Sequence, residues 1–302
     1  MLIAANQRSV PDYYGAIPSA VNSGKVKSRG LELEMRVQKR LREVNAWFSA
    51  YWTKAVNKII FREDPELKPN YQKQAGYTIG QNRTYVIDEI IQSWDNMYTG
   101  TLYESGFNNN ATLIPGDYRM VDYNADGIIN SQDVVPYQYS NSPQNTYGFS
   151  FGGDYKGFGI NILFYGAYNA SLQMNDLSRL EFLDSKVVVY PEQIANTFTP
   201  EYGNSNPSYR ALNFNRNTQR GTFMGNSFMY DASFLRLKTA ELSYTFPKEW
   251  ISKLNMDNCR LYINGNNLFL WSNLPYDVEG VTLDYRNYPT TKLYNIGFQV
   301  TF

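Results

Sequence analysis

The feature that most constrains the fold is a strict two-residue alternation of apolar and polar side chains at the end of the chain. Every second position there carries an apolar or aromatic side chain: Tyr294, Ile296, Phe298, Val300 and Phe302. Successive side chains of a β-strand point to opposite faces of its sheet, so this pattern predicts a strand with one apolar and one polar face. Strands of soluble β-sandwiches also alternate, so the pattern alone does not separate a soluble protein from a membrane protein.

The same alternation recurs along the chain and predicts seven strands. Their expected ranges are 31–38, 44–61, 146–154, 158–168, 233–246, 260–271 and 293–302. Within 233–246 the alternation changes phase, because Leu235 and Leu237 occupy odd positions whereas Leu242 and Tyr244 occupy even ones. One extra residue in a strand produces such a change, so we expect a β-bulge between these pairs.

The connections between these strands are alternately short and long. The short ones are 39–43, 155–157 and 247–259, and the long ones are 62–145, 169–232 and 272–292. Outer-membrane barrels have short periplasmic turns and long extracellular loops, which produces this order. We therefore predict an all-β fold, an antiparallel transmembrane β-barrel segment, with its last strand ending in the periplasm at Phe302.

Aromatic residues agree with this orientation, because bilayer interfaces favour rings at both ends of the strands. The expected periplasmic ends carry Phe158, Phe246, Trp250 and Phe302, and the expected outer ends carry Trp52, Tyr168, Trp271 and Tyr294.

Composition excludes several kinds of function. The 302 residues include 28 Lys and Arg against 28 Asp and Glu, no histidine and one cysteine, Cys259. A balanced charge argues against a nucleic-acid partner. Without histidine there is no Ser-His-Asp triad, and one cysteine forms neither an internal disulfide nor a cysteine-based metal cage.

Several blocks resemble the C-terminal part of SusC/RagA-type TonB-linked outer-membrane transporters. They are residues 24–34, 147–157, 234–238, 242–247 and 260–268, and they occur in the same order as in that family. The resemblance covers nearly the whole chain but only about the last third of such a transporter. It implies part of a 22-stranded barrel, and the signal peptide, TonB box and plug domain of the family have no counterpart here.

The resemblance also implies a function, a location and partners. An intact transporter of this type imports bulky nutrients, glycans or peptides, across the outer membrane. TonB–ExbB–ExbD supplies the energy through the missing N-terminal part, and a SusD-like surface lipoprotein covers the barrel. No catalytic residue and no required cofactor is expected, and the barrel contacts outer-membrane lipid.

One segment has the spacing of a calcium-binding loop. Its six expected ligands are Asp122, Asn124, Asp126, the backbone carbonyl of Ile128, Asn130 and Asp133, with Gly127 at the tight turn. Oxygen ligands at this spacing suit Ca²⁺, although the last position holds Asp where a bidentate Glu is usual. The alternative is an Asx-rich turn held by hydrogen bonds from its own backbone.

Two other functions stay open at this stage. A soluble all-β carbohydrate-active enzyme or carbohydrate-binding module would bury the apolar strand faces against a second sheet, whereas a barrel turns them toward lipid. A remnant without activity is the third reading. Rings in the long connections could stack on sugars or pack on one another: Tyr71, Tyr77, Trp94, Tyr98, Tyr103, Tyr190, Tyr202 and Tyr209.

Overall fold

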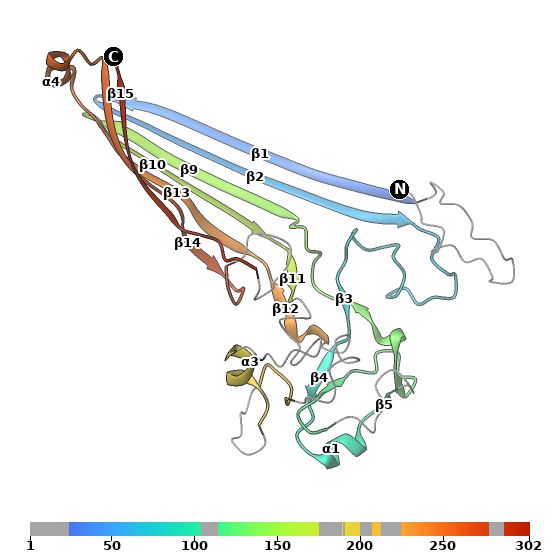
Figure 1. Cartoon of the computed structure of the whole chain (residues 1–302). Coiled ribbons are helices and arrows are strands. Elements are labelled where there is room, and N and C mark those ends of the chain that lie inside the picture. The colour runs from blue at the N-terminus through green and yellow to red at the C-terminus, as the bar shows by residue number, and fades with distance from the viewer. Residues whose placement is uncertain are drawn as a thin grey trace, which may run out of the picture.

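The protein is described by a computed structural model that covers residues 24–103, 114–174, 189, 191–199, 207–212, 225–277 and 287–302. Seven long strands form one antiparallel sheet in the order β1-β2-β9-β10-β13-β14-β15 (Figure 1). Each strand therefore lies beside its predecessor among the seven. Their bounds are β1 Lys25–Leu41, β2 Val44–Phe61, β9 Asn145–Tyr155, β10 Phe158–Tyr168, β13 Phe234–Thr245, β14 Asn258–Ser272 and β15 Leu293–Thr301.

The short connections lie together at one end of the sheet, beside the C-terminus (Figure 1). Arg42 and Lys156 have positive φ angles of 55° and 46°, and Gly157 follows at 90°. Two consecutive positive φ angles suit a tight hairpin turn between twisted strands. The third connection contains α4 Lys248–Ile251 and the 3₁₀ helix η9 Ser252–Leu254, with Pro247 at the N-cap of α4.

The bulge predicted in β13 is also confirmed. Leu163 of β10 lies opposite Thr239, but the next residue, Phe164, lies opposite Leu237, so Lys238 is the extra residue. The extra residue restores Leu237 to the same face as Ala240. All the predicted apolar residues of the strand consequently share one side of the sheet.

The long connections fold into a separate layer at the other end of the sheet (Figure 1). Its elements are β3 Arg83–Thr84, β4 Ile87–Ile90, α1 Trp94–Thr99, β5 Leu102–Tyr103, β6 Tyr118–Met120, β7 Ile128–Ile129, the 3₁₀ helix η4 Ser131–Asp133, β8 Val135–Pro136, β11 Ser171–Gln173, α3 Pro191–Asn196, the 3₁₀ helix η8 Gly225–Phe228 and β12 Met229–Asp231. Four small pairings, β3–β8, β4–β6, β5–β7 and β11–β12, join segments that are distant in sequence.

The buried core of the chain lies in this loop layer rather than on the long sheet. Phe228 and Ile129 are fully buried, and around them pack Tyr85, Tyr103, Tyr118, Met120, Ala170, Leu172, Met174, Tyr209 and Ala232. Burying rings and aliphatic side chains supplies most of the stabilisation of such a layer. We call the connections described here, with this core, the loop layer.

No helix in the described part of the chain is long and apolar enough to cross a membrane.

Candidate functional site

The first candidate surface is the apolar face of the seven-stranded sheet. Strand register places the alternating residues of all seven strands on one side, so that Leu33 lies opposite Trp52, Ile263 opposite Ile296, and Leu261 opposite Phe298. We call this side the outward face. Its side chains are exposed, among them Leu33 at 55%, Ile296 at 77% and Phe298 at 62%.

An exposed apolar surface of this extent marks contact with a partner or with a membrane. A soluble sandwich would cover it with a second sheet, and no such sheet occurs among the described residues. The opposite, inward face is polar. There the Arg260 guanidinium pairs with Glu241 at 2.5 Å, and Asn295 donates to Asn264 at 2.9 Å.

Glycines on the inward face accommodate aromatic rings from neighbouring strands. Tyr51 lies opposite Gly148 and Tyr262 opposite Gly297, with each ring over its glycine. A Cβ atom at Gly297 would lie 2.1 Å from the Tyr262 ring, so this position tolerates no larger residue without movement. Rings lying flat over glycines give the strands packing that glycine alone cannot supply.

Aromatic side chains gather at both ends of the outward face. At the short-turn end the ring centroids of Phe158 and Tyr244 are 4.6 Å apart, and Phe246 lies 5.1 Å from Tyr244. At the loop end Phe164 and Phe269 each lie near Trp271, at 6.4 and 6.2 Å. Rings at both ends of an apolar face suit the two interfaces of a bilayer, and Phe48 and Phe151 add rings between them.

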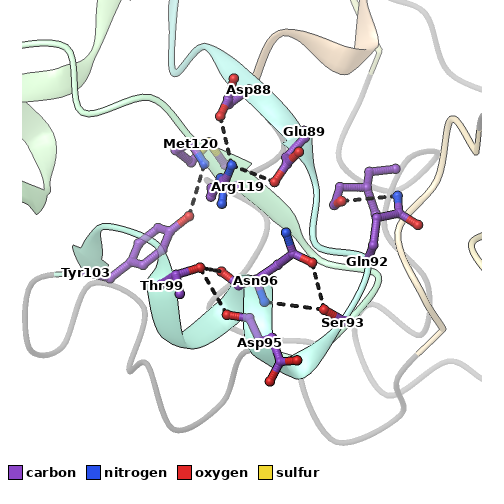
Figure 2. Close-up of polar contacts among 11 residues, drawn as sticks. Asp88, Glu89, Gln92, Ser93, Asp95, Asn96, Thr99, Tyr103, Arg119 and Met120 are labelled. Carbon is purple, nitrogen blue, oxygen red and sulfur yellow. Dashed lines mark hydrogen bonds and ion pairs between the residues drawn. The ribbon is translucent and has the colours of Figure 1, made fainter.

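The second candidate surface is the loop layer, whose segments are fixed by polar contacts. Figure 2 shows Arg119 of β6 between Asp88 and Glu89 of β4, at 3.2 and 2.5 Å. The hydroxyl of Tyr103 donates to the carbonyl of Tyr118 at 3.3 Å. These contacts join β4, β5 and β6 into one preformed unit.

The aromatic side chains of the loop layer that the sequence suggested for stacking on sugars differ in their exposure to solvent. Tyr103 and Tyr209 are buried in its core, whereas Trp94 and Tyr98 of α1 are exposed at 53% and 77%. Tyr190 and Tyr202 lie outside the described residues.

The predicted calcium loop lies in this layer, and its last residue, Asp133, is the most buried of the expected ligands. Asp133 is 1% exposed, and both of its carboxylate oxygens accept backbone N–H groups. Oδ1 accepts from Tyr123 at 2.8 Å and from Asn124 at 3.4 Å, and Oδ2 accepts from Asn130 at 2.8 Å. Asn130 in turn caps η4 by accepting from the N–H of Gln132 at 2.7 Å.

The first half of the loop is more exposed. Asp122 accepts from the N–H groups of Asp126 at 3.3 Å and Gly127 at 2.8 Å. Asp126 accepts from Ile128 N–H at 2.9 Å and from the Asn124 side-chain amide at 2.8 Å. These are the hydrogen bonds of an Asx-rich turn, and each carboxylate oxygen keeps a further lone pair for a cation.

In the described part of the chain no group of three or more His, Cys, Asp or Glu side chains is arranged to hold a metal ion. The donor set is that of a hard cation site, because it consists of carboxylate and amide oxygens. Calcium binding at Asp122, Asn124, Asp126, Ile128, Asn130 and Asp133 therefore stays a prediction.

The preceding connection is tied onto this loop. The Tyr71 hydroxyl donates to the Gln132 carbonyl at 2.8 Å, and the Tyr71 and Tyr123 rings meet at 4.9 Å between centroids. Burial, together with the negative charge of Asp133, raises the pKa of Tyr71. A hydrogen bond and a ring contact therefore hold the loop against the segment that follows β2.

Comparison of the sequence with known proteins identifies two relatives. No family model matches the chain. The chain is 24% identical over 322 residues to TonB-dependent receptor P3 of Formosa agariphila, a match that covers 98% of this chain and 30% of that protein. TonB-dependent receptor P26 of the same organism is 29% identical over 210 residues, covering 63% of this chain and 20% of that protein. The chain is a relative of the TonB-dependent receptors.

Solved structures agree with this relationship. The RagAB peptide transporter superposes with a TM-score of 0.68 at 18% identity over 98% of this chain and 32% of that one. The RagAB peptide importer in its open-open state gives 0.69 over 100% of this chain and 31% of that one. The chain therefore has the antiparallel β fold of the matching part of an outer-membrane transporter. It spans about 30% of the length of receptor P3 and of the RagAB chain.

These comparisons confirm three predictions about this TonB-dependent receptor relative. Its resemblance to the SusC/RagA type is supported by RagAB, its location is the outer membrane, and it is not an enzyme, because its relatives are receptors and transporters. The exposed Ile296 and Phe298 agree with this result, since a sandwich enzyme would bury them.

Proposed function

We propose that the chain forms part of the wall and the extracellular loop layer of a TonB-dependent active transporter for bulky nutrients. The observation that carries this proposal is the exposed apolar outward face with aromatic rings at both ends, and the described long connections packed at one end only. Such a sheet gains stability from contact with lipid, and it presents its loops to the outside of the cell.

The remaining parts of the machine are proposed from the resemblance. A plug domain would fill the lumen against the polar inward face, because a barrel of this size needs one. TonB–ExbB–ExbD would deliver energy through that plug, and a SusD-like lipoprotein would cover the loop layer. Among the described strands, β1 pairs only with β2 and β15 only with β14, so the barrel would close through these two edges.

The substrates proposed are glycans or peptides. RagAB is a peptide transporter, and the similarity of this chain to it favours peptides as the first substrates to test. The loop layer supports the proposal, because its buried core fixes the described long connections at one end of the sheet.

An uptake assay tests the proposal. Cells with an in-frame deletion of this coding region, and cells carrying it on a plasmid, receive fluorescent peptide and oligosaccharide pools, with and without a protonophore. We expect import that requires both the gene and the proton-motive force. Import that is unaffected by the deletion would contradict the transport function and favour the inactive remnant.

A structural calcium ion in the loop layer is a further part of the proposal. It would hold the exposed turn of Asp122 and Asp126, while Asp133 already fixes the base of the loop. Extracellular calcium is abundant enough for a site of moderate affinity.

A further inference from the structure

A cavity of about 410 Å³ lies where the inward face meets the loop layer. Ligand pockets typically measure roughly 300–1,000 Å³. The cavity is therefore large enough for a group the size of one amino-acid residue together with part of the groups attached to it. Its lining residues are Asn141, Pro143, Tyr165, Ala167, Ala170, Leu172, Ala232, Phe234, Arg236, Lys238, Leu270, Ser272 and Leu274.

The sheet supplies one wall of the cavity, and register shows which side of the sheet it is. Tyr165 lies opposite Arg236, and Ala167 lies opposite Phe234. Their neighbours in sequence, Phe164 and Gly166, belong to the outward face. The wall is therefore on the inward side, facing the path that a substrate would take.

The β13 bulge keeps the cationic residues on this wall. With Lys238 as the extra residue, Lys238 and Thr239 both face inward, and Arg236 keeps the same side. Bulges often re-aim side chains next to binding sites.

The loop layer supplies the opposite wall, and it is rigid. Ala170, Leu172 and Ala232 are 3%, 5% and 7% exposed and belong to the buried core. Backbone bonds hold them, since Ala232 N–H donates to Ala170 C=O at 2.9 Å. The cavity is thus preformed, and binding in it costs little ordering of the protein.

The lining selects an apolar group. Eight of its thirteen residues have wholly apolar side chains. Arg236 is 5% exposed, and its guanidinium pairs with Asp277, with Nη1 to Oδ2 at 2.9 Å. The charge of Arg236 is therefore paired with a carboxylate. A sugar ring in this space would lose water from hydroxyl groups that find few partners, which is costly.

We propose that this cavity is a subsite for an apolar side chain, such as Leu or Phe, of an imported peptide. The inference rests on the proposed transport function and narrows it to peptides over glycans. A peptide suits the geometry, because its apolar side chain enters the cavity while its polar backbone stays on the polar inward face.

The test is calorimetric binding to the protein extracted in detergent from the outer membranes of its native cells. The probes are pentapeptides Gly-Gly-Xaa-Gly-Gly with Leu, Phe, Ala or Asp at Xaa, and an uncharged pentasaccharide. We expect the Leu and Phe peptides to bind about 10-fold more tightly than the Ala peptide, because their larger apolar side chains are buried. The pentasaccharide should bind more weakly than any of them.

Two variants connect that preference to the cavity. Ala167→Leu fills it and should reduce the Leu-to-Ala preference to near one. Leu270→Ala enlarges it without crowding the buried core, and should raise the Phe-to-Leu ratio about threefold. The matched control is Ala240→Leu, which changes the outward face of β13 and should leave every ratio unchanged.

Unchanged ratios in both cavity variants would overturn the subsite. Tighter binding of the pentasaccharide than of the Leu peptide would also overturn it. The proposed transport function is judged separately, by TonB-dependent uptake in cells, so import of oligosaccharide alone would leave transport standing and reject the peptide subsite.

Discussion

The indole N–H of Trp52 donates a hydrogen bond to the hydroxyl of Tyr168 across 3.0 Å. The two residues are 116 positions apart, and they belong to β2 and β10, which are separated in the sheet by β9. The bond therefore spans one whole strand at the loop end of the outward face. A pair of amphipathic rings fixed in this way is suited to the outer interface of the bilayer.

Removing this bond should weaken the wall slightly. We expect Tyr168→Phe and Trp52→Phe each to lower the free energy of unfolding in lipid vesicles by about 1 kcal/mol, the usual net value of one hydrogen bond. In a double-mutant cycle the two effects should couple, because both remove the same bond. Strictly additive effects would show that the bond contributes nothing to stability.

A charge on the outward face should be far more damaging than one on the inward face. Ala50 of β2 is outward, opposite Met35, and Ser150 of β9 is inward, opposite Ser49. We expect Ala50→Arg to cost about 2–4 kcal/mol in a bilayer, as arginine does near the midplane of a barrel.

The matched variant Ser150→Arg should cost less than about 1 kcal/mol, because its charge meets the polar inward face. Guanidinium titration of vesicle-inserted protein, followed by tryptophan fluorescence, measures both. If the two variants were equally stable, the assignment of outward and inward faces would be wrong.

These faces and strand limits were largely predictable from sequence. The ranges of β2 and β10 agree with the predicted 44–61 and 158–168, because alternation marks both strands clearly. β1 begins at Lys25 rather than at residue 31, and the first part of this strand, Lys25–Gly30, is polar enough to hide its alternation. Pairing with residues 55–61 of β2 extends it beyond the apolar pattern.

The loop layer was not predictable in the same way. Ile129 and Phe228 are fully buried, yet β7 and η8, the elements that carry them, are only two and four residues long. Elements of this length carry no readable period, and their partners lie far away in sequence. The sequence left two alternatives for Tyr103 and Tyr209, stacking on sugars or packing within the loops. Both side chains are buried in the core of the loop layer, which agrees with packing. The cavity was missed for the same reason, since its walls come from four distant segments.

The calcium hypothesis separates two roles within one loop. We expect Asp126→Ala to lower the thermal midpoint by a few degrees in calcium but not in a chelator, because Asp126 lies in the exposed half of the loop. Equal losses in both conditions would count against the metal site.

Asp133→Ala provides the contrasting variant. It leaves the N–H groups of Tyr123 and Asn130 without their carboxylate partner, so it should destabilise the loop by about 2–3 kcal/mol with or without calcium. Hydrogen exchange of residues 114–136 measures this loss locally. A loss seen only in calcium would instead assign Asp133 mainly to the metal.

High pH should loosen the loop layer through Tyr85. Burial, with a smaller contribution from Asp133, raises the pKa of Tyr85 above its usual value near 10. The folded state then holds the proton more tightly than the unfolded state. The associated stability is complete below about pH 10 and is lost as the pH rises through the folded pKa.

We expect the thermal midpoint of the loop layer to fall as the pH rises above about 10, and to fall less steeply in Tyr85→Phe, which has no proton to lose. Near-ultraviolet circular dichroism at graded pH would follow the transition. Identical alkaline slopes in the two proteins would mean that other groups control it.

The bulge in β13 also decides on which side of the sheet Arg236 lies. If Lys238 took a regular place in the strand, Lys238 and Arg236 would continue the outward alternation of Ala240 and Leu242, and Arg236 would emerge among acyl chains. The Arg236–Asp277 pair would then be lost, and with it the tether that holds the segment after β14 to the sheet. One bulged residue thus lets a single strand keep apolar side chains on its outward face along its whole length and still place a guanidinium on the inward face at its loop end.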